Sequence, residues 1–401
     1  MSRTETPAGT LPADWPAPDA YAAGHSEQLC QVLADAAAAD GNWISFRDWM
    51  DCVLYSPGLG YYSAGATRFG AAGDFITAPE MSSLFGQTLA QHCRDSLAAC
   101  AGDTILELGP GRGLLARDIL QTLELEDALP ARYLMLDRSG ALRQEQAETL
   151  SGLSSAALSR VGWLDRLPQK AFNGIILANE VIDALPVERF RRQASDVQQV
   201  GVRWSDNGFQ EAHRSAPPDL KMRVEQLEDD LGRTLESGYT SELCADLEPW
   251  LGGLAASLNR GLLLFIDYGY TRTEFYHPER WMGTLRCHYR HRAHDDWLLL
   301  PGLQDLTASV DFTAVALAGH QAGLDVLGYA PQSHFLMAAG LTDLLAAAAS
   351  SDPSIHLKLA QQAKALMLPG EMGERFQVLA LGRNFSAPVT GFQLYNHVEK
   401  L

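Results

Sequence analysis

Three closely spaced glycines after a short apolar segment are the most informative feature of this chain. In TILELGPGRGLL, residues 104–115, they are Gly109, Gly111 and Gly113, and Glu107 comes just before them. Glycine lets the backbone turn tightly and approach a ligand that any Cβ would displace. An apolar strand, this turn and the start of a helix after it together indicate a nucleotide-binding loop.

The spacing of the glycines indicates which ligand the loop suits. A dinucleotide loop with the pattern GxGxxG needs its third glycine at position 114, which is Leu114. The pattern here is ExGxGxG, which is similar to the loop of class I methyltransferases that bind S-adenosyl-L-methionine. We therefore expect Glu107 and the three glycines to contact this cofactor; the alternative is an ordinary tight turn between a strand and a helix.

Polar side chains follow other apolar segments in the same way. Asp137 ends the run YLMLD, and an acid at that strand end of a Rossmann-like sheet accepts hydrogen bonds from ribose hydroxyls. Asn179 ends NGIILAN, where it could contact the methionine part of the donor or cap the next helix. Asp267 and Tyr268 close a further strand, where an open α/β sheet binds ligands, so we expect them to line a substrate slot. Simple strand termination is the alternative for Asp137, Asp267 and Tyr268.

Three histidines in CHYRHRAHDD invite a metal hypothesis. His288, His291 and His294 are three residues apart, but the interleaved arginines would repel a cation. We expect no metal site, and a basic, aromatic substrate lid instead. Arg68 and the helix start near Pro79 could contact the carboxylate of the donor, since helix amino termini favour anions.

Strands and helices alternate at the rhythm of a doubly wound α/β sheet. A Rossmann-like, seven-stranded sheet is predicted, with strands at 104–108, 132–137, 173–178, 261–267, 324–330 and, antiparallel, 376–383. Two helices precede it within residues 26–55, and a capping box predicts another from about Pro79 toward Ala98. Asn207-Gly208 predicts a β-hairpin, and residues 216–258 a helical stretch.

These segments predict a domain layout. We expect a mobile tail at 1–25, an N-terminal helical region at 26–100, a methyltransferase domain at 101–385 and a C-terminal tail at 386–401. Insertions are expected at about 195–258 and 270–305. The second insertion could be either a lid or a dimer surface.

Composition excludes several classes of protein. The 31 Lys and Arg against 49 Asp and Glu give a formal net charge of −18, which argues against nucleic-acid binding. No apolar run is as long as a membrane span. The six cysteines lack CxxC pairs and predict reduced thiols, and the N-terminus lacks the pattern of a signal peptide or an Arg-rich presequence. A cytoplasmic protein is expected.

Several ordered motifs carry a resemblance to a known family. They include PGLGYYS at 57–63, GDFITAPEMSSLFG at 73–86, ELGPGRG at 107–113, NEVIDALPV at 179–187, GTLRCHYRH at 283–291 and PGEMGERFQVLALGR at 369–383. With them the chain resembles the MidA family, methyltransferases that include a mitochondrial arginine methyltransferase of complex I assembly. The resemblance implies a class I methyltransferase fold, S-adenosyl-L-methionine as donor and methylation of arginine on a protein substrate. The family often has Glu where this chain has Asp137.

An arginine acceptor would place the chemistry on Glu180 and Asp183. A planar guanidinium pairs with carboxylates in bidentate fashion, and both acids follow the strand that ends at Asn179. If the chain turns helically there, the i, i+3 spacing puts them on one face. Asp183 could equally cap a helix.

Alternatives remain open at this level. The chain could methylate a small molecule or another side chain, or hold a partner as a non-catalytic assembly factor that binds the donor. The sequence does not identify the substrate, the degree or symmetry of methylation, or the oligomeric state, for which a homodimer is one option.

Overall fold

The computed structural model describes residues 9–64, 77–137, 140–349 and 353–401, and the chain divides into two compact units. The first unit contains Met1–Phe75, Ala184–Asp246 and Arg272–Ser309. The second contains Ile76–Asp183, Leu247–Thr271 and Val310–Leu401. Each unit is thus assembled from three segments that are separate in the sequence.

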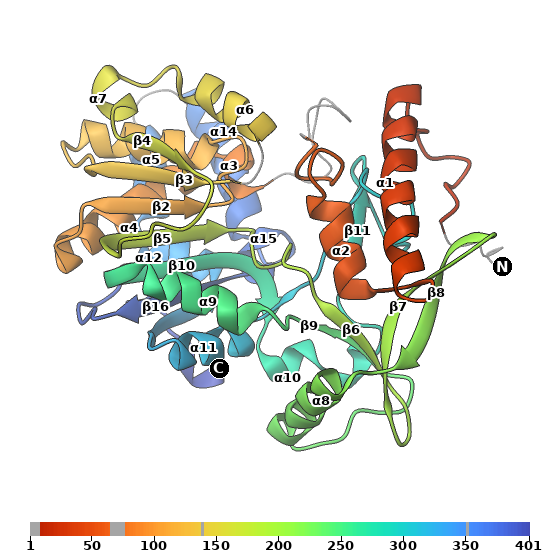
Figure 1. Cartoon of the computed structure of the whole chain (residues 1–401). Coiled ribbons are helices and arrows are strands. Elements are labelled where there is room, and N and C mark those ends of the chain that lie inside the picture. Colours follow the sequence, from red (N-terminus) through yellow and green to blue (C-terminus); the bar gives the residue numbers. More distant parts are fainter. Residues whose placement is uncertain (1–8, 65–76, 138–139, 350–352) are drawn as a thin grey trace. The chain divides into compact units, whose positions relative to one another are not determined.

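A mostly parallel sheet forms the centre of the second unit (Figure 1). Its strand order is β15-β16-β10-β5-β2-β3-β4, and β14 pairs with the end of β10. Strands β10, β5, β2, β3 and β4 are parallel, whereas β16 is antiparallel to β10 and β15. The bounds are β2 Thr104–Leu108, β3 Arg132–Leu136, β4 Val161–Leu164, β5 Phe172–Asn179, β10 Leu258–Tyr270, β14 Val310–Asp311, β15 Asp325–Pro331 and β16 Phe376–Arg383.

Helices cover this sheet, so its central strands are apolar on both faces. In β5 every residue from Gly174 to Ala178 is buried. One large core joins side chains of α4, α5 and α12 to the sheet, and α9 and α11 pack against each other and against β10. The helices are α3 Ala78–Met81, α4 Ser83–Cys100, α5 Leu114–Leu125, α6 Gly140–Leu150, α7 Ser155–Leu158, α9 Leu247–Ala256, α11 Phe312–Gln321, α12 Gln332–Ala338, α13 Leu341–Ala349, α14 Pro353–Met367, α15 Met372–Arg375 and the 3₁₀ helix η3 Val398–Lys400.

The first unit contains two antiparallel sheets and the N-terminal helices (Figure 1). One sheet has the order β1-β7-β6-β9 with β8 on β7, and the other the order β12-β11-β13. Aromatic side chains hold its core together; the rings of Phe46 and Trp297 meet edge to face at 4.9 Å. The elements are α1 Ala20–Ala39, β1 Trp43–Ser45, α2 Phe46–Tyr55, β6 Glu188–Arg192, β7 Val197–Ser205, β8 Gly208–Ser215, α8 Pro218–Leu231, β9 Thr240–Leu243, α10 Arg272–Phe275, the 3₁₀ helix η2 Pro278–Arg280, β11 Arg286–Tyr289, β12 Arg292–His294 and β13 Asp305–Thr307.

The predicted α/β architecture and its six named strands are confirmed, and so is the hairpin at Asn207-Gly208. Gly208 has φ +89° and pairs with Ser205 across the β7–β8 turn. The seventh strand of the sheet is β4, which is only four residues long and was not among the predicted ranges. In the described part of the chain, no helix is long and apolar enough to cross a membrane.

Three expectations about local structure need correction. The helix predicted from Pro79 breaks at Ser82, whose hydroxyl accepts a hydrogen bond from the Leu84 N–H and so caps α4. The stretch 216–258 contains β9 between two helices, because pairing with β6 there overrides the helical pattern. Residues 386–401 are not a free tail, since Val389 and Phe392 are buried in the core of the second unit.

Gly174 lies where the sheet leaves no room for a side chain. A Cβ at this position would lie 1.9 Å from the carbonyl oxygen of Thr104 on β2. Gly174→Ala must therefore push β2 and β5 apart and should lower the free energy of unfolding by about 3 kcal/mol or more. Calorimetric unfolding measures this. Gly152→Ala, at a position with no atom near its added Cβ, is the matched control; equal melting temperatures for the two variants would contradict the prediction.

Candidate active site

The glycine-rich loop joins β2 to α5 in a strained backbone conformation that favours glycine. Gly109, Gly111 and Gly113 have φ of +58°, +50° and +79°. A Cβ on Gly109 would touch Val181 at 3.0 Å, whereas a Cβ on Gly111 would meet no atom within 4 Å. The loop is thus closely packed at its start and open at its middle glycine, as a loop that receives a ligand should be.

Gln146 ties this loop to the end of the next strand. This fully buried amide of α6 donates hydrogen bonds to the Gly111 carbonyl at 2.8 Å and to Asp137 Oδ2 at 2.9 Å. Its oxygen accepts from Trp163 Nε1 on β4 at 2.9 Å. Asp137 is therefore held beside the loop, and its contact with the ribose of a donor stays a prediction. The sequence analysis missed Gln146, because a glutamine in a polar helix carries no signal before the neighbouring strands are placed.

Glu107 lies at the end of β2 with its carboxylate buried. Oε2 accepts a hydrogen bond from the Tyr133 hydroxyl on β3 at 2.8 Å. Burial and, more weakly, the nearby Asp137 raise the pKa of Glu107 to about 7, although the hydrogen bond from the Tyr133 hydroxyl opposes the shift. Glu107 is thus an acid that titrates near neutrality and is held in place by a neighbouring strand.

Glu180 follows directly after β5 and has a strained backbone. Its φ is +53°, which is uncommon for a residue other than glycine and points to a functional position. Oε1 accepts hydrogen bonds from Asn179 Nδ2 at 3.1 Å and from the Ala78 N–H at 3.4 Å. No residue in the described ranges donates a hydrogen bond to Oε2, and the buried Asn179 Oδ1 likewise has no partner there. The pair therefore presents two oxygens to a ligand.

Burial and the nearby carboxylate of Asp183 raise the pKa of Glu180 to about 8. The hydrogen bonds from Asn179 and Ala78 oppose this shift. Asp183 is buried as well and acts on both Glu180 and Asp267. Three acids thus crowd one edge of the sheet, at the carboxyl ends of β5 and β10. A cation bound among them would relieve their mutual repulsion.

Asp267 anchors the loop that carries the other two acids. Its Oδ2 accepts hydrogen bonds from the N–H groups of Val181, Ile182 and Asp183 at 3.2, 2.9 and 3.2 Å. Its Oδ1 accepts from the Tyr268 N–H at 2.9 Å. Burial and the two neighbouring acids raise the pKa of Asp267, and the backbone donors oppose this. The geometry does not support the expected contact of Asp267 with substrate, because both oxygens already bind backbone.

Tyr268 and the helix start at Ala78 have different surroundings. The Tyr268 ring packs edge to face on Phe376 of β16 at 5.6 Å, on the margin of the core, so its predicted place in a substrate slot stays a prediction. Ala78 begins α3, behind a capping box of Thr77 and Glu80, and its N–H points at Glu180 rather than at a free anion. Arg68 lies outside the described residues.

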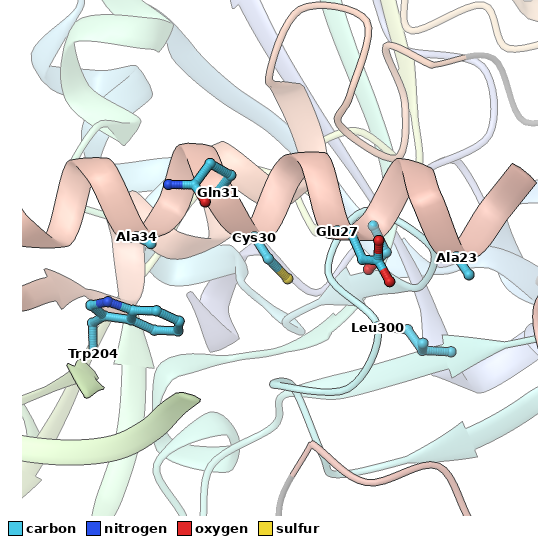
Figure 2. Close-up of a pocket in the computed structure, with 8 residues that line it drawn as sticks. Ala23, Glu27, Cys30, Gln31, Ala34, Trp204 and Leu300 are labelled. Atoms are coloured by element: carbon cyan, nitrogen blue, oxygen red, sulfur yellow. The ribbon is translucent and has the colours of Figure 1, made fainter. Parts of the chain in front are cut away.

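The first unit holds the histidines of CHYRHRAHDD and a separate hollow. His288 and His294 lie on the β11–β12 hairpin, and across the described ranges no group of three metal-ligating side chains converges. The hollow has a volume of about 320 Å³. Glu27, Cys30 and Gln31 line it along α1, and Trp204 lies opposite them (Figure 2). Burial raises the pKa of the Cys30 thiol, so it is not an activated nucleophile. The hollow therefore offers no activated nucleophile.

Comparison with known proteins finds a matching family model and several relatives. Residues 87–330 match the Methyltransf_28 family model, which describes S-adenosyl-L-methionine-dependent methyltransferases. The mitochondrial protein arginine methyltransferase NDUFAF7 of Danio rerio is 31% identical over 392 residues, 89% of this chain and 87% of that protein. Its Drosophila melanogaster homolog is 30% identical over 432 residues, 98% of this chain and 94% of that protein.

A solved structure is more similar still. A COG1565 superfamily member from Burkholderia thailandensis, crystallised with S-adenosyl-homocysteine, is 40% identical and superposes with a TM-score of 0.91. The alignment covers 97% of this chain and 100% of that one. The fold of this chain is therefore one that holds the demethylated form of the donor.

The role of Asp267 as an anchor can be tested through the backbone that it holds. Asp267→Asn would turn an amide N–H₂ or a weaker acceptor toward the three N–H groups of residues 181–183. We expect amide hydrogen exchange in that segment to accelerate about tenfold or more, because each charge-assisted bond contributes about 1.5 to 3 kcal/mol. Mass spectrometry of peptides covering 178–190 measures this. Asp206→Asn, in an exposed turn, is the control; unchanged exchange in Asp267→Asn would remove the anchoring role.

Proposed function

This chain belongs to the Methyltransf_28 family of S-adenosyl-L-methionine-dependent methyltransferases, and on that premise we propose that it methylates an arginine side chain of a protein. The names of the curated relatives carry this activity. The single observation that supports it here is the pair of acids after β5, in which Glu180 has a strained backbone and no hydrogen-bond donor to its Oε2 in the described ranges.

The residues at the strand edge fit the donor. At Gly111, in the open middle of the loop, we expect the loop backbone to approach the donor closely. We assign Asp137, which Gln146 orients, to the ribose hydroxyls of the donor. Asn179 Oδ1, a buried acceptor without a partner in the described ranges, suits the ammonium of the methionine part. Glu107 lies on the neighbouring strand β2. When bound, the donor supplies a methyl group on a sulfonium.

Glu180 is the residue that we assign to orienting the acceptor. A guanidinium nitrogen must lie in line with the methyl carbon, and a carboxylate fixes the guanidinium plane through bidentate pairing. Methylation of a guanidinium cation releases one proton, since the product is again a monocation. A carboxylate whose pKa is about 8 can accept that proton near neutral pH. Asp183 adds the second negative charge.

Asp267 and Asn179 support this arrangement from behind. The backbone held by Asp267 sets the position of Asp183, and the Asn179 amide holds Glu180 Oε1. We keep a cytoplasmic location as part of the proposal, supported by the six cysteines, which all lie in the described ranges and form no disulfide there. A homodimer likewise stays a proposal.

The glycine loop gives a direct test of donor binding. Gly111→Val should abolish binding of S-adenosyl-L-methionine and S-adenosyl-homocysteine, because a branched side chain fills the open space and resists φ +50°. Isothermal titration calorimetry measures this. Gly208→Val, at another positive-φ glycine in the β7–β8 turn of the first unit, controls for backbone strain. Normal donor affinity in a folded Gly111→Val variant would show that the donor does not bind at this loop.

The charge of Glu180 can be separated from its shape. Glu180→Gln should leave S-adenosyl-homocysteine affinity nearly unchanged but lower methyl transfer about a hundredfold, because the amide keeps the volume and loses the charge. The assay uses labelled donor, the proteome of a strain that lacks the protein and mass spectrometry of the labelled residue. Label on a small molecule or another side chain would overturn the arginine assignment, and normal transfer by Glu180→Gln would overturn the role of Glu180.

The pH dependence follows from the raised pKa. Glu180 is active as a carboxylate, so in the free enzyme its active fraction increases with pH and levels off above about 8. The ratio kcat/KM should therefore rise about tenfold per pH unit below that value. The rise should be absent from the residual activity of Glu180→Gln. A flat profile in the unmodified enzyme would contradict the assignment.

A further inference from the structure

A second pocket in the first unit is lined by two arginines. It has a volume of about 230 Å³ and lies between the end of β6, the turn before β9 and η2. The residues that line it are Arg191, Arg233, Glu236, Ser237, Gly238, Tyr239, Pro278 and Trp281. None of them belongs to the strand edge assigned above to methyl transfer.

Arg191 is the unusual residue of this pocket. Strand β6 carries three arginines, and two of them have acidic partners: Arg189 lies 3.2 Å from Glu242, and Arg192 lies 2.8 Å from Glu228. Arg191 is half-buried, its Nε is fully buried, and within the described ranges its guanidinium has neither a hydrogen bond nor an ion pair. A buried guanidinium nitrogen without an acceptor is costly, which indicates that an acceptor outside the chain completes it.

The second arginine adds to this positive charge. Arg233 donates a hydrogen bond to the Tyr276 carbonyl, and in the described part of the chain no carboxylate lies within 4.0 Å of it. Glu236, which also lines the pocket, is exposed and forms no such ion pair with either arginine. Two guanidinium groups therefore face one hollow of a chain whose net charge is −18.

An aromatic wall stands beside the two arginines. Trp281 is 57% exposed, which is unusual for so large an apolar side chain. Tyr239 is buried, and its hydroxyl donates to the His277 carbonyl at 3.3 Å. Burial raises the pKa of Tyr239 to about 12, so this side chain stays neutral and does not oppose an anion. The wall offers flat apolar surface next to the charged donors.

We propose that this pocket binds a small organic anion, with a carboxylate or phosphate group on Arg191 and Arg233 and a flat apolar group against Trp281. Planar guanidinium donors match both oxyanions in bidentate fashion. An aromatic ring gains contact area on the exposed indole. This site is independent of the proposed methyl transfer, since it uses neither the donor loop nor the acids after β5.

The test is calorimetric titration of the full chain, in buffer of low chloride, with phenyl phosphate, benzoate, inorganic phosphate and neutral phenol. We expect one aryl anion to bind more tightly than inorganic phosphate, and phenol not to bind. Comparison of phenyl phosphate with benzoate shows whether the two arginines prefer a phosphate or a carboxylate group. Absence of binding by both aryl anions at millimolar concentration would overturn the proposal.

Variants then locate the binding. Arg191→Gln should lower the affinity for the aryl anion about tenfold or more. Glu236→Gln should raise that affinity. Arg203→Gln removes the same charge from an exposed position outside the pocket and should have little effect. If Arg191→Gln does not fold, Trp281→Ala replaces it in the test. This variant should lower the affinity for phenyl phosphate but not the affinity for inorganic phosphate. Equal weakening by Arg191→Gln and Arg203→Gln would reduce the effect to net charge and overturn the site.

Discussion

The carboxylate of Asp267 holds the backbone on which the strand-edge site depends. It is buried at the carboxyl end of β10 and accepts four backbone N–H groups, three of them from consecutive residues after β5. That segment leaves the sheet through Glu180, at a positive φ that costs energy unless its surroundings hold it. The anchor therefore makes the strained position sustainable, and the strain aims the Glu180 carboxylate at the edge of the sheet.

Charge is the second organising principle of that edge. Asp183 and Asp267 are almost fully buried. Asp183 raises the pKa of both Glu180 and Asp267, and Glu180 raises the pKa of Asp267 as well. An arrangement of this kind is unfavourable without a cation, and both the sulfonium of the donor and a guanidinium acceptor are cations. Binding of such a cation would relieve the repulsion among the three acids.

The two units do not follow one another along the sequence, because each is built from three separate segments. The helices before residue 64, the hairpin around Gly208 and the stretch 272–309 fold into one unit with its own aromatic core. This unit carries the arginine pocket, whereas the donor loop and the acids lie in the other. Two stretches that look like insertions along the sequence, 184–246 and 272–309, are thus parts of the first unit.

Local pattern alone determined much of this protein. The ExGxGxG loop, the apolar strands and the acids at their ends predicted the sheet, the donor and the positions of Asp137 and Glu180, because strand and turn signals lie within a few residues. Tertiary structure decided the rest. Gln146 became a link between Gly111 and Asp137, and Asp267 an anchor rather than a substrate contact, only when parallel pairing brought distant strand ends together. Strand β9 formed within a helical pattern because β6 offered an unpaired edge. Hydrogen-bond partners far apart in the chain are invisible to local spacing, and those partners set the role of each polar side chain here.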